Sequence, residues 1–139
     1  MGDFDIREQI QASLDASPFA VFCGFRAEEA DKAAGRLVLR MPMRPDMERL
    51  ADSGQMHGGP IACLIDTAGC YAATLVLGHG VPTINFRTDY LRPVIDSGLT
   101  AVAVVRRAGR TVTVADVDVF DDRERLVATG RATFGSRAG

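Results

Sequence analysis

One carboxylate stands alone in a long apolar part of the chain. Asp66 is the only charged residue between His57 and His79. A carboxylate that is buried without a partner is costly, so we expect Asp66 to be paired, protonated or open to a pocket. In a pocket it would have the chemistry of a general base or of a nucleophile. The alternative is a structural carboxylate that an arginine or backbone donors satisfy.

The residues His57-Gly58-Gly59-Pro60 precede this carboxylate, at the point where a helix is expected to start. Proline at the first helical position is typical of a helix start. The free N–H groups of the first turn, together with the helix dipole, can stabilise a developing oxyanion. Two successive glycines let a ligand approach the backbone closely, although they could also serve only to form the turn.

The apolar segment from Pro60 to Leu77 is predicted to be a buried helix. Its length reaches that of a membrane span, but Asp66 near its centre and the lack of basic flanks favour a helix inside a soluble protein. At helical spacing the neighbours of Asp66 form a small-residue face: Ala62, Cys63, Gly69, Cys70 and Ala73. Such a face suits a thin substrate or the close approach of a second subunit.

The segments before this helix are expected to start the scaffold. Residues 5–16 have apolar residues at four-residue spacing, which predicts an amphipathic helix. Residues 19–29 are interpreted as a first strand and residues 36–41 as a second, because apolar and polar residues alternate in the latter. Residues 44–57 read as a polar loop.

Four segments rich in β-branched residues follow the helix and predict a four-strand antiparallel meander. They are residues 82–92, 99–107, 110–120 and 125–134. In the third segment the apolar phase changes between Val114 and Val117, which indicates a bulge or a strand covered on both faces. The pattern as a whole is α+β, with a sheet that curls around a helix that is apolar on nearly all sides.

Composition limits the classes of function. The chain has 139 residues, 47% hydrophobic content and a net charge of −2, which predicts one domain over residues 1–139 and no nucleic-acid surface. Residues 1–17 would form a helix ahead of the core. The acidic first ten residues contain no apolar run typical of a secretory signal. Cys23, Cys63 and Cys70 lack zinc or disulfide spacing, so we expect reduced thiols in the cytoplasm, no metal and no cofactor.

Two weaker groups of candidates remain. Cys70 lies four residues after Asp66, where the negative charge would raise the thiol pKa and so reduce its reactivity. Arg107 and Arg110 belong to a basic cluster around a predicted turn, with Arg106 and Arg131. Guanidinium groups bind phosphates well, although solvated turn charges are the alternative interpretation.

Two motifs carry a resemblance to a known family. The run HGGPIACLIDTAGCYAA, followed by TINFRTDYLRPV, resembles the hotdog-fold acyl-CoA thioesterases of the phenylacetic-acid-degradation type. The similarity covers roughly residues 17–135. It implies a long central helix wrapped by a curved antiparallel sheet of five or six strands. It also implies homodimers joined edge to edge through their sheets, usually paired into a homotetramer, with active sites at the dimer interface.

The same resemblance implies roles for individual residues. The backbone N–H of Gly58 would polarise the thioester carbonyl, and His57 would position the motif. Asp66 from the opposite protomer would act as nucleophile or general base, and Thr83 would help to hold the attacking water. Gly59 would allow the substrate to approach.

One position departs from the family pattern. An Asn or Gln usually lies six residues before the motif histidine and completes the carbonyl-polarising pair, whereas this chain has Ala51 there. Asp52 or Gln55 could take its place, and Gln55 is the better donor because its amide carries two N–H groups. Losing one oxyanion donor typically lowers turnover about 100- to 1000-fold.

Three functions therefore stand as hypotheses. The first is hydrolysis of an acyl- or aryl-CoA thioester, with the CoA nucleotide held by Arg107 and Arg110 because the chain has no Gly-rich phosphate loop. The second is non-catalytic acyl-CoA binding. The third is a hotdog hydroxyacyl-thioester dehydratase, which would need a strand histidine opposite the helix acid. The substrate-binding set of the first hypothesis is Gly59, Gln55, Cys70, Arg107 and Arg110.

Overall fold

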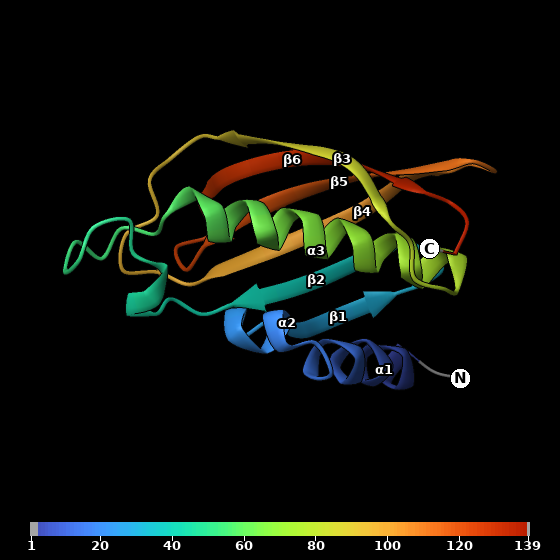
Figure 1. The fold of residues 1–139 in the computed structure, drawn as a ribbon, viewed down its shortest axis with the longest axis horizontal. Coiled ribbons are helices and arrows are strands. Elements are labelled where there is room, and N and C mark those ends of the chain that lie inside the picture. Colours follow the sequence, from blue (N-terminus) through green and yellow to red (C-terminus); the bar gives the residue numbers. More distant parts are fainter. Residues whose placement is uncertain (1–2, 139) are drawn as a thin grey trace.

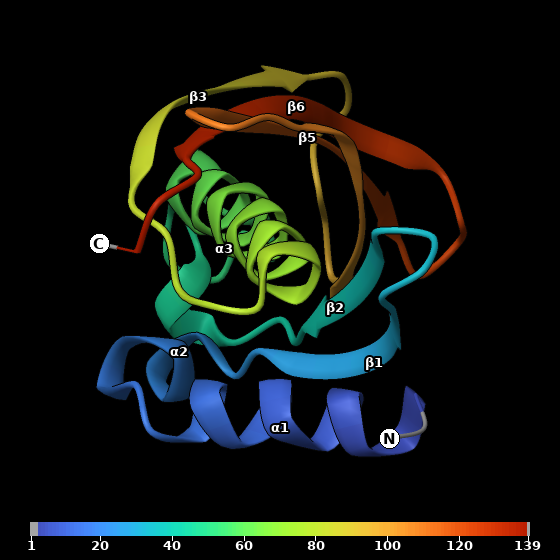
Figure 2. The same ribbon diagram turned by 90° about the vertical axis from the view of Figure 1, so that its right-hand side faces the viewer.

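A computed structural model describes residues 3–138 and places one long helix against the inner side of a curved sheet (Figure 1). The sheet has six strands, all neighbours antiparallel, in the order β1-β2-β4-β5-β6-β3. The view along the long helix shows the sheet curving over it (Figure 2). The predicted α+β hotdog architecture, with a central helix wrapped by five or six strands, is confirmed.

The elements follow the chain in this order: α1 (Asp3–Asp15), α2 (Pro18–Cys23), β1 (Arg26–Asp31), β2 (Arg36–Met41), a 3-10 turn (Pro45–Met47), α3 (Gly58–Leu77), β3 (Thr83–Tyr90), β4 (Leu99–Ala108), β5 (Val112–Asp121) and β6 (Leu126–Gly135). The helices predicted before Pro18 and after His57 are confirmed, as are the second strand and the four later ones. By length and composition α3 would pass for a membrane span. In the structure it is the core helix, and Leu64, Ile65 and Ala68 at its centre are fully buried.

The single strand expected over residues 19–29 is wrong. Residues 18–23 form α2, and β1 begins only at Arg26. Ser17 caps α2 by accepting a hydrogen bond from the Ala20 N–H, and Pro18 begins the helix. Gly24 ends it in the left-handed conformation, at φ 75°. These start and stop residues outweigh the β-propensity of the apolar residues between them.

The four-strand meander is also corrected. β4, β5 and β6 are consecutive antiparallel neighbours, but β3 pairs with β6 and lies at the sheet edge, while β4 pairs with β2. Residues 91–98 connect β3 to β4 without forming a tight hairpin turn. That length lets the chain return past the N-terminal end of α3 and place β4 in the middle of the sheet (Figure 1).

The bulge lies in a different strand from the one expected. Alternate residues of β5 are buried along its length, and Ala115 occupies the inward position between Thr113 and Val117. The register instead shifts in β4, where Val105 pairs with Ala115 and Arg107 pairs with Val114. Arg106 is therefore the extra residue. The small apolar side chain of Ala115 carries too weak a signal to reveal the phase of β5 from sequence.

The sheet covers one part of the small-residue face of α3 and leaves the other part half-buried. Gly69 and Ala73 are buried, and a Cβ at Gly69 would lie 3.2 Å from the ring of Phe134 on β6. Among the residues whose burial the structure describes, Phe134 is the largest fully buried side chain. Its ring can pack on α3 only where the helix carries small residues. The predicted exposure of this face is wrong at these two positions. Ala62, Cys63 and Cys70 stay half-buried around Asp66.

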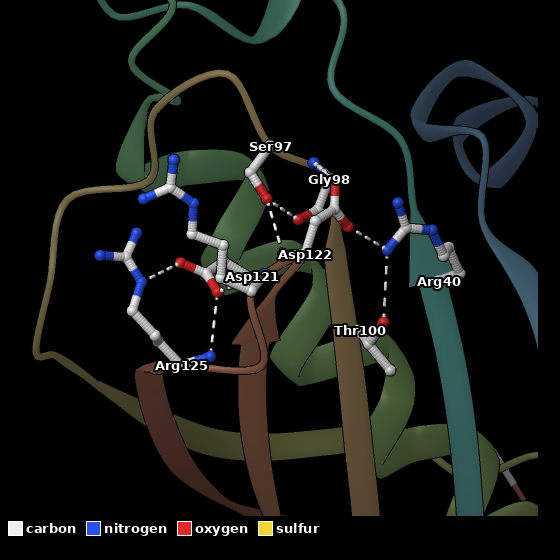
Figure 3. A network of polar contacts seen from close by, with 8 residues as sticks. Arg40, Ser97, Gly98, Thr100, Asp121, Asp122 and Arg125 are labelled. Atoms are coloured by element: carbon white, nitrogen blue, oxygen red, sulfur yellow. Dashed lines mark hydrogen bonds and ion pairs between the residues drawn. The ribbon is translucent and has the colours of Figure 1, made fainter.

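A network of polar contacts lies at the β5–β6 turn (Figure 3). Asp121 accepts hydrogen bonds from the backbone N–H groups of Arg123 and Arg125 and from the Arg125 side chain. Asp122 accepts from Gly98 N–H and pairs with Arg40 at 2.8 Å. These contacts tie the turn to β2 and to the loop that leads into β4.

Because of this network, the stability of the fold is expected to vary with pH in the acid range. The backbone N–H of Arg125 is the main cause that lowers the pKa of Asp121, and the Arg40 hydrogen bond is the main cause for Asp122. A lowered folded-state pKa contributes stability that is present above the unfolded value of about 3.9 and is lost as the pH falls through the folded value. We therefore expect the unfolding temperature to fall between pH 5 and pH 3. Asp122→Asn should flatten that dependence, and an unfolding temperature independent of pH in this range would contradict the assignment.

Candidate active site

His57 begins the site by capping α3. It is the N-cap residue, with extended backbone, and its Nδ1 accepts a hydrogen bond from the Gly59 N–H at 2.8 Å. Pro60 is accordingly the third residue of the helix and not the first, which corrects the expected start. Neutral His57 with Nδ1 as acceptor carries its proton on Nε2. Within the described chain, the Gly58 N–H has no hydrogen-bond partner and remains open at the positive end of the helix.

A cleft of about 390 Å³ lies beside this helix start. Gln55 and Gly58 both line it, so the structure brings the proposed amide donor and the free N–H to the same cleft. Ala51 is exposed and does not line it, and Asp52 lines a separate hollow with Asp96 and Gly54. Of the two proposed replacements for the missing Asn or Gln, only Gln55 lines the same cleft as Gly58.

Asp66 lies further along α3 and is half-buried. Thr83, the first residue of β3, donates a hydrogen bond to Asp66 Oδ1 at 2.8 Å. Among residues 3–138, no arginine, lysine or histidine forms an ion pair with Asp66. The structure thus brings two separately predicted site residues, Asp66 and Thr83, into contact within one chain, whereas Thr83 was expected to hold the attacking water. The interpretation of Asp66 as the partner of an arginine does not hold within one chain.

Gly58 and Asp66 are too far apart to act on one carbonyl from the same chain. They are separated by eight residues of continuous helix, or about 12 Å at 1.5 Å per residue. A nucleophile or base must come within about 3 Å of the reacting atom. A site that uses both residues therefore needs a second copy of the chain.

The strand that carries Thr83 is an open sheet edge. β3 pairs only with β6 within the described residues, and seven of its eight positions are exposed. Ile84 is 58% exposed and Tyr90 is 53% exposed, which is unusual for large side chains at an edge. A long unpaired edge with exposed apolar residues is a template for pairing with another strand. β3 thus leaves one side of its backbone unpaired within the described residues.

The cysteines are poor nucleophiles. Burial, followed by the charge of Asp66, raises the pKa of both Cys63 and Cys70. The predicted effect of Asp66 on Cys70 is confirmed. Cys70 also donates weakly to the Val81 carbonyl at 3.6 Å. It therefore contributes half-buried surface beside Asp66.

The basic cluster lies at the other end of the protomer. Arg106 and Arg131 both pair with Asp116, and the Arg131 hydrogen bond is the main cause that lowers the pKa of Asp116. Arg107 and Arg110 are exposed at the β4–β5 turn and form no ion pair within residues 3–138. This turn lies near the C-terminal end of α3, away from Gly58 (Figure 1). One protomer does not bring these arginines to its own Gly58 cleft.

Three polar residues of the cleft were missed by the sequence interpretation. Tyr90, Arg92 and Arg49 line it with Gly58. The run Tyr-Leu-Arg-Pro at the end of β3 was a usable signal for the first two, because polar side chains at a strand end adjoin the neighbouring loops. Arg49 lies in the polar loop, which has no periodic pattern to locate it.

Comparisons with known proteins place the chain in a family and match its fold. Residues 53–128 match the family model described as "Thioesterase superfamily". The chain is 35% identical to a putative esterase of Halobacterium salinarum, over 94% of this chain and 91% of the relative. It is 30% identical to the medium/long-chain acyl-CoA thioesterase YigI of Salmonella typhimurium, over 84% of each chain. Among solved structures, the E. coli PaaI protein of the phenylacetic acid degradation operon is 26% identical, with a TM-score of 0.85 over 99% of this chain and 96% of that one.

Proposed function

The chain belongs to the thioesterase superfamily, and from that premise we propose that it hydrolyses acyl- or aryl-CoA thioesters to a free acid and CoA. The observation that carries the proposal is the separation of its two reactive features. A free helix-start N–H at Gly58 and a carboxylate at Asp66 lie about 12 Å apart along one helix. Each is incomplete alone, and a second protomer that pairs through the β3 edge would supply the missing half.

In this proposal the thioester carbonyl lies against the cleft of one protomer. The Gly58 N–H and the Gln55 amide donate to the carbonyl oxygen, and they stabilise it further as negative charge develops. His57 holds the helix start by binding the Gly59 N–H. The lack of side chains at Gly58 and Gly59 lets the substrate approach the backbone.

The partner protomer would supply the carboxylate. Asp66 acts as a general base, taking a proton from water that attacks the carbonyl carbon, or as a nucleophile that forms an acyl-enzyme anhydride. In either route the C–S bond breaks and CoA leaves as the thiolate, which is then protonated. In the nucleophilic route water then hydrolyses the anhydride, which releases the free acid and regenerates the Asp66 carboxylate. Thr83 fixes the orientation of the carboxylate through its 2.8 Å hydrogen bond. Cys70 provides half-buried surface for the substrate next to that carboxylate.

The proposed assembly is a homodimer, or a dimer of dimers, in the cytoplasm. Residues 1–139 would form a single domain, with α1 ahead of the hotdog core. Support for the dimer comes from the exposed β3 edge and from the half-buried face of α3 around Asp66, which the sheet of the same chain covers only in part. No nucleic acid, membrane, metal or cofactor has a part in the proposed reaction.

Thiol release from a panel of CoA esters tests the activity. Aryl, short-chain, medium-chain and long-chain acyl esters should be compared, because one relative is described as a medium/long-chain acyl-CoA thioesterase. Turnover of at least one ester by the wild type is expected. Tight binding without thiol release for every ester would favour the non-catalytic acyl-CoA binder, for which the departure at Ala51 is the relevant feature.

We expect Arg107 and Arg110 to hold the CoA phosphates. Both are exposed and free of ion pairs within the described chain, whereas Arg106 and Arg131 share Asp116. Arg107→Ala or Arg110→Ala should raise KM for CoA esters severalfold with little change in kcat, because phosphate contacts are equal in the ground and transition states. KM of the wild type should also rise with ionic strength.

Truncated pantetheine esters provide the control for that prediction. They lack the nucleotide, so both arginine variants should process them like the wild type. Arg26→Ala is the matched substitution, since Arg26 is also exposed but lies on β1, at the opposite edge of the sheet from β3. If the arginine substitutions impaired the hydrolysis of pantetheine esters as much as that of CoA esters, the two arginines would only maintain the fold.

A further inference from the structure

Tyr90 holds the residue that carries the free N–H. Its hydroxyl donates a hydrogen bond to the Gly58 carbonyl oxygen at 2.7 Å. Its ring packs on the same residue, because a Cβ added to Gly58 would lie 3.2 Å from Cζ and from the hydroxyl oxygen. Both residues line the cleft that also contains Gln55. Tyr90 thus contacts Gly58 through a hydrogen bond and through van der Waals packing.

Gly58 needs such a contact because nothing in its own side chain restrains it. Glycine at the first position of a helix has wide backbone freedom, and helix ends fray. His57 and Tyr90 both hold the peptide unit between Gly58 and Gly59, since the Gly59 N–H donates to His57 and the Gly58 carbonyl accepts from Tyr90. The Gly58 N–H lies in the preceding peptide plane, so its direction relative to this held unit depends on rotation at the Gly58 Cα. The Tyr90 ring limits that rotation by packing against the Cα.

The same strand also holds the other half of the proposed site. Thr83 at the start of β3 bonds Asp66, and Tyr90 at the end of β3 bonds Gly58. α3 is therefore attached to the edge strand at both of its reactive positions. Because β3 is also the open edge, the strand that would meet a second copy sets the direction of the Gly58 N–H and of the Asp66 carboxylate.

We propose that Tyr90 is a positioning residue that directs the Gly58 N–H at the thioester oxyanion by clamping the Gly58 carbonyl and Cα. The inference rests on the proposed hydrolase function. It adds a residue that acts through Gly58 and does not itself contact the reacting atoms. The hydroxyl is a donor throughout the neutral range, since burial raises the pKa of Tyr90 further above neutrality.

The test removes only the hydroxyl. Tyr90→Phe should lower kcat about tenfold, the size of effect of one lost hydrogen bond, with KM unchanged. This split is expected because the Gly58 N–H binds the oxyanion of the transition state more strongly than the neutral carbonyl of the substrate. Tyr90→Leu, which also loses the ring, should lower kcat further.

The chain offers a matched control, since Tyr71 is its only other tyrosine. The Tyr71 hydroxyl shares a 2.8 Å hydrogen bond with Ser13 of α1, away from the Gly58 cleft. Tyr71→Phe should leave kcat and KM unchanged. In protein labelled with ¹⁵N-glycine, the Gly58 amide resonance should shift in Tyr90→Phe and remain in place in Tyr71→Phe.

The outcomes separate this inference from the proposed function. If the wild type hydrolyses CoA esters but Tyr90→Phe keeps the wild-type kcat and the Gly58 resonance, the positioning role is wrong and the hydrolase function stands. If no ester is hydrolysed, the proposed function fails, and the Gly58 resonance still decides whether Tyr90 orients that N–H. Equal changes in kcat in Tyr71→Phe and Tyr90→Phe would reduce Tyr90 to a general packing role.

Discussion

Asp66→Asn is expected to abolish thioester hydrolysis while the protein stays folded. Asparagine has the same shape as aspartate but is neither a useful base nor a nucleophile at neutral pH. Its side-chain oxygen can still accept the hydrogen bond from Thr83, which lies at 2.8 Å from Asp66 in the wild type. We expect a loss of at least about 1000-fold in kcat, since removing the residue that activates or performs the attack leaves only binding and carbonyl polarisation.

Asp118→Asn is the matched control for this experiment. Thr129 donates to Asp118 at 2.8 Å, so the pair has the same chemistry and distance as Thr83 and Asp66. Asp118 lies on β5 and is exposed on the side of the sheet away from α3. Thiol release and the unfolding temperature should be measured for both variants. Wild-type turnover in a pure Asp66→Asn preparation would remove Asp66 from the mechanism.

Mixing two inactive variants should restore activity. Asp66→Asn retains the Gly58 cleft, and Gly58→Val retains the carboxylate while its side chain fills the cleft against Tyr90. If each site combines Gly58 of one protomer with Asp66 of the other, a mixed dimer has one complete site and one doubly defective site. Random exchange in an equal mixture makes half of the dimers mixed, so about a quarter of all sites recover.

The recovery has clear controls. Each variant put alone through the same subunit exchange should stay inactive, and purified mixed dimers should reach about half of the wild-type activity. Light scattering should show at least a dimer for the wild type and both variants. A monomer with full activity, or no recovery in proven mixed dimers, would contradict a site shared between protomers.

Local patterns were enough to predict the parts of this protein that depend on neighbouring residues. α3 was predictable because its sequence is a continuous apolar run of helical length. The backbone N–H and C=O groups of such a run pair with one another, as in a helix. Its reactive features were also local, because His57-Gly58-Gly59 marks a helix start and Asp66 is the lone acid that follows. The strands after α3 were predictable from β-branched residues between turns.

The errors came from features that depend on distant residues. β3 was placed next to β4 because hairpins join consecutive strands, whereas the structure pairs it with β6 at the sheet edge. The exposure of Gly69 and Ala73 was wrong because Phe134, some 60 residues later in the chain, packs against Gly69 and forms one buried cluster with Ala73. Local periodicity does not reveal the order of strands in a sheet. It also does not reveal which small residues a distant large side chain will pack on.

The sequence by itself determined which residues could react: a helix-start N–H, a carboxylate eight residues further on and an amide in the preceding loop. Only the tertiary structure decided how they are held. Placing β3 at the edge brings Thr83 to Asp66 and Tyr90 to Gly58, and leaves the strand open to a second copy. The physical reason is that hydrogen bonds across 17 and 32 residues exist only once the sheet has curled around α3, and strand order is set by packing of the whole chain.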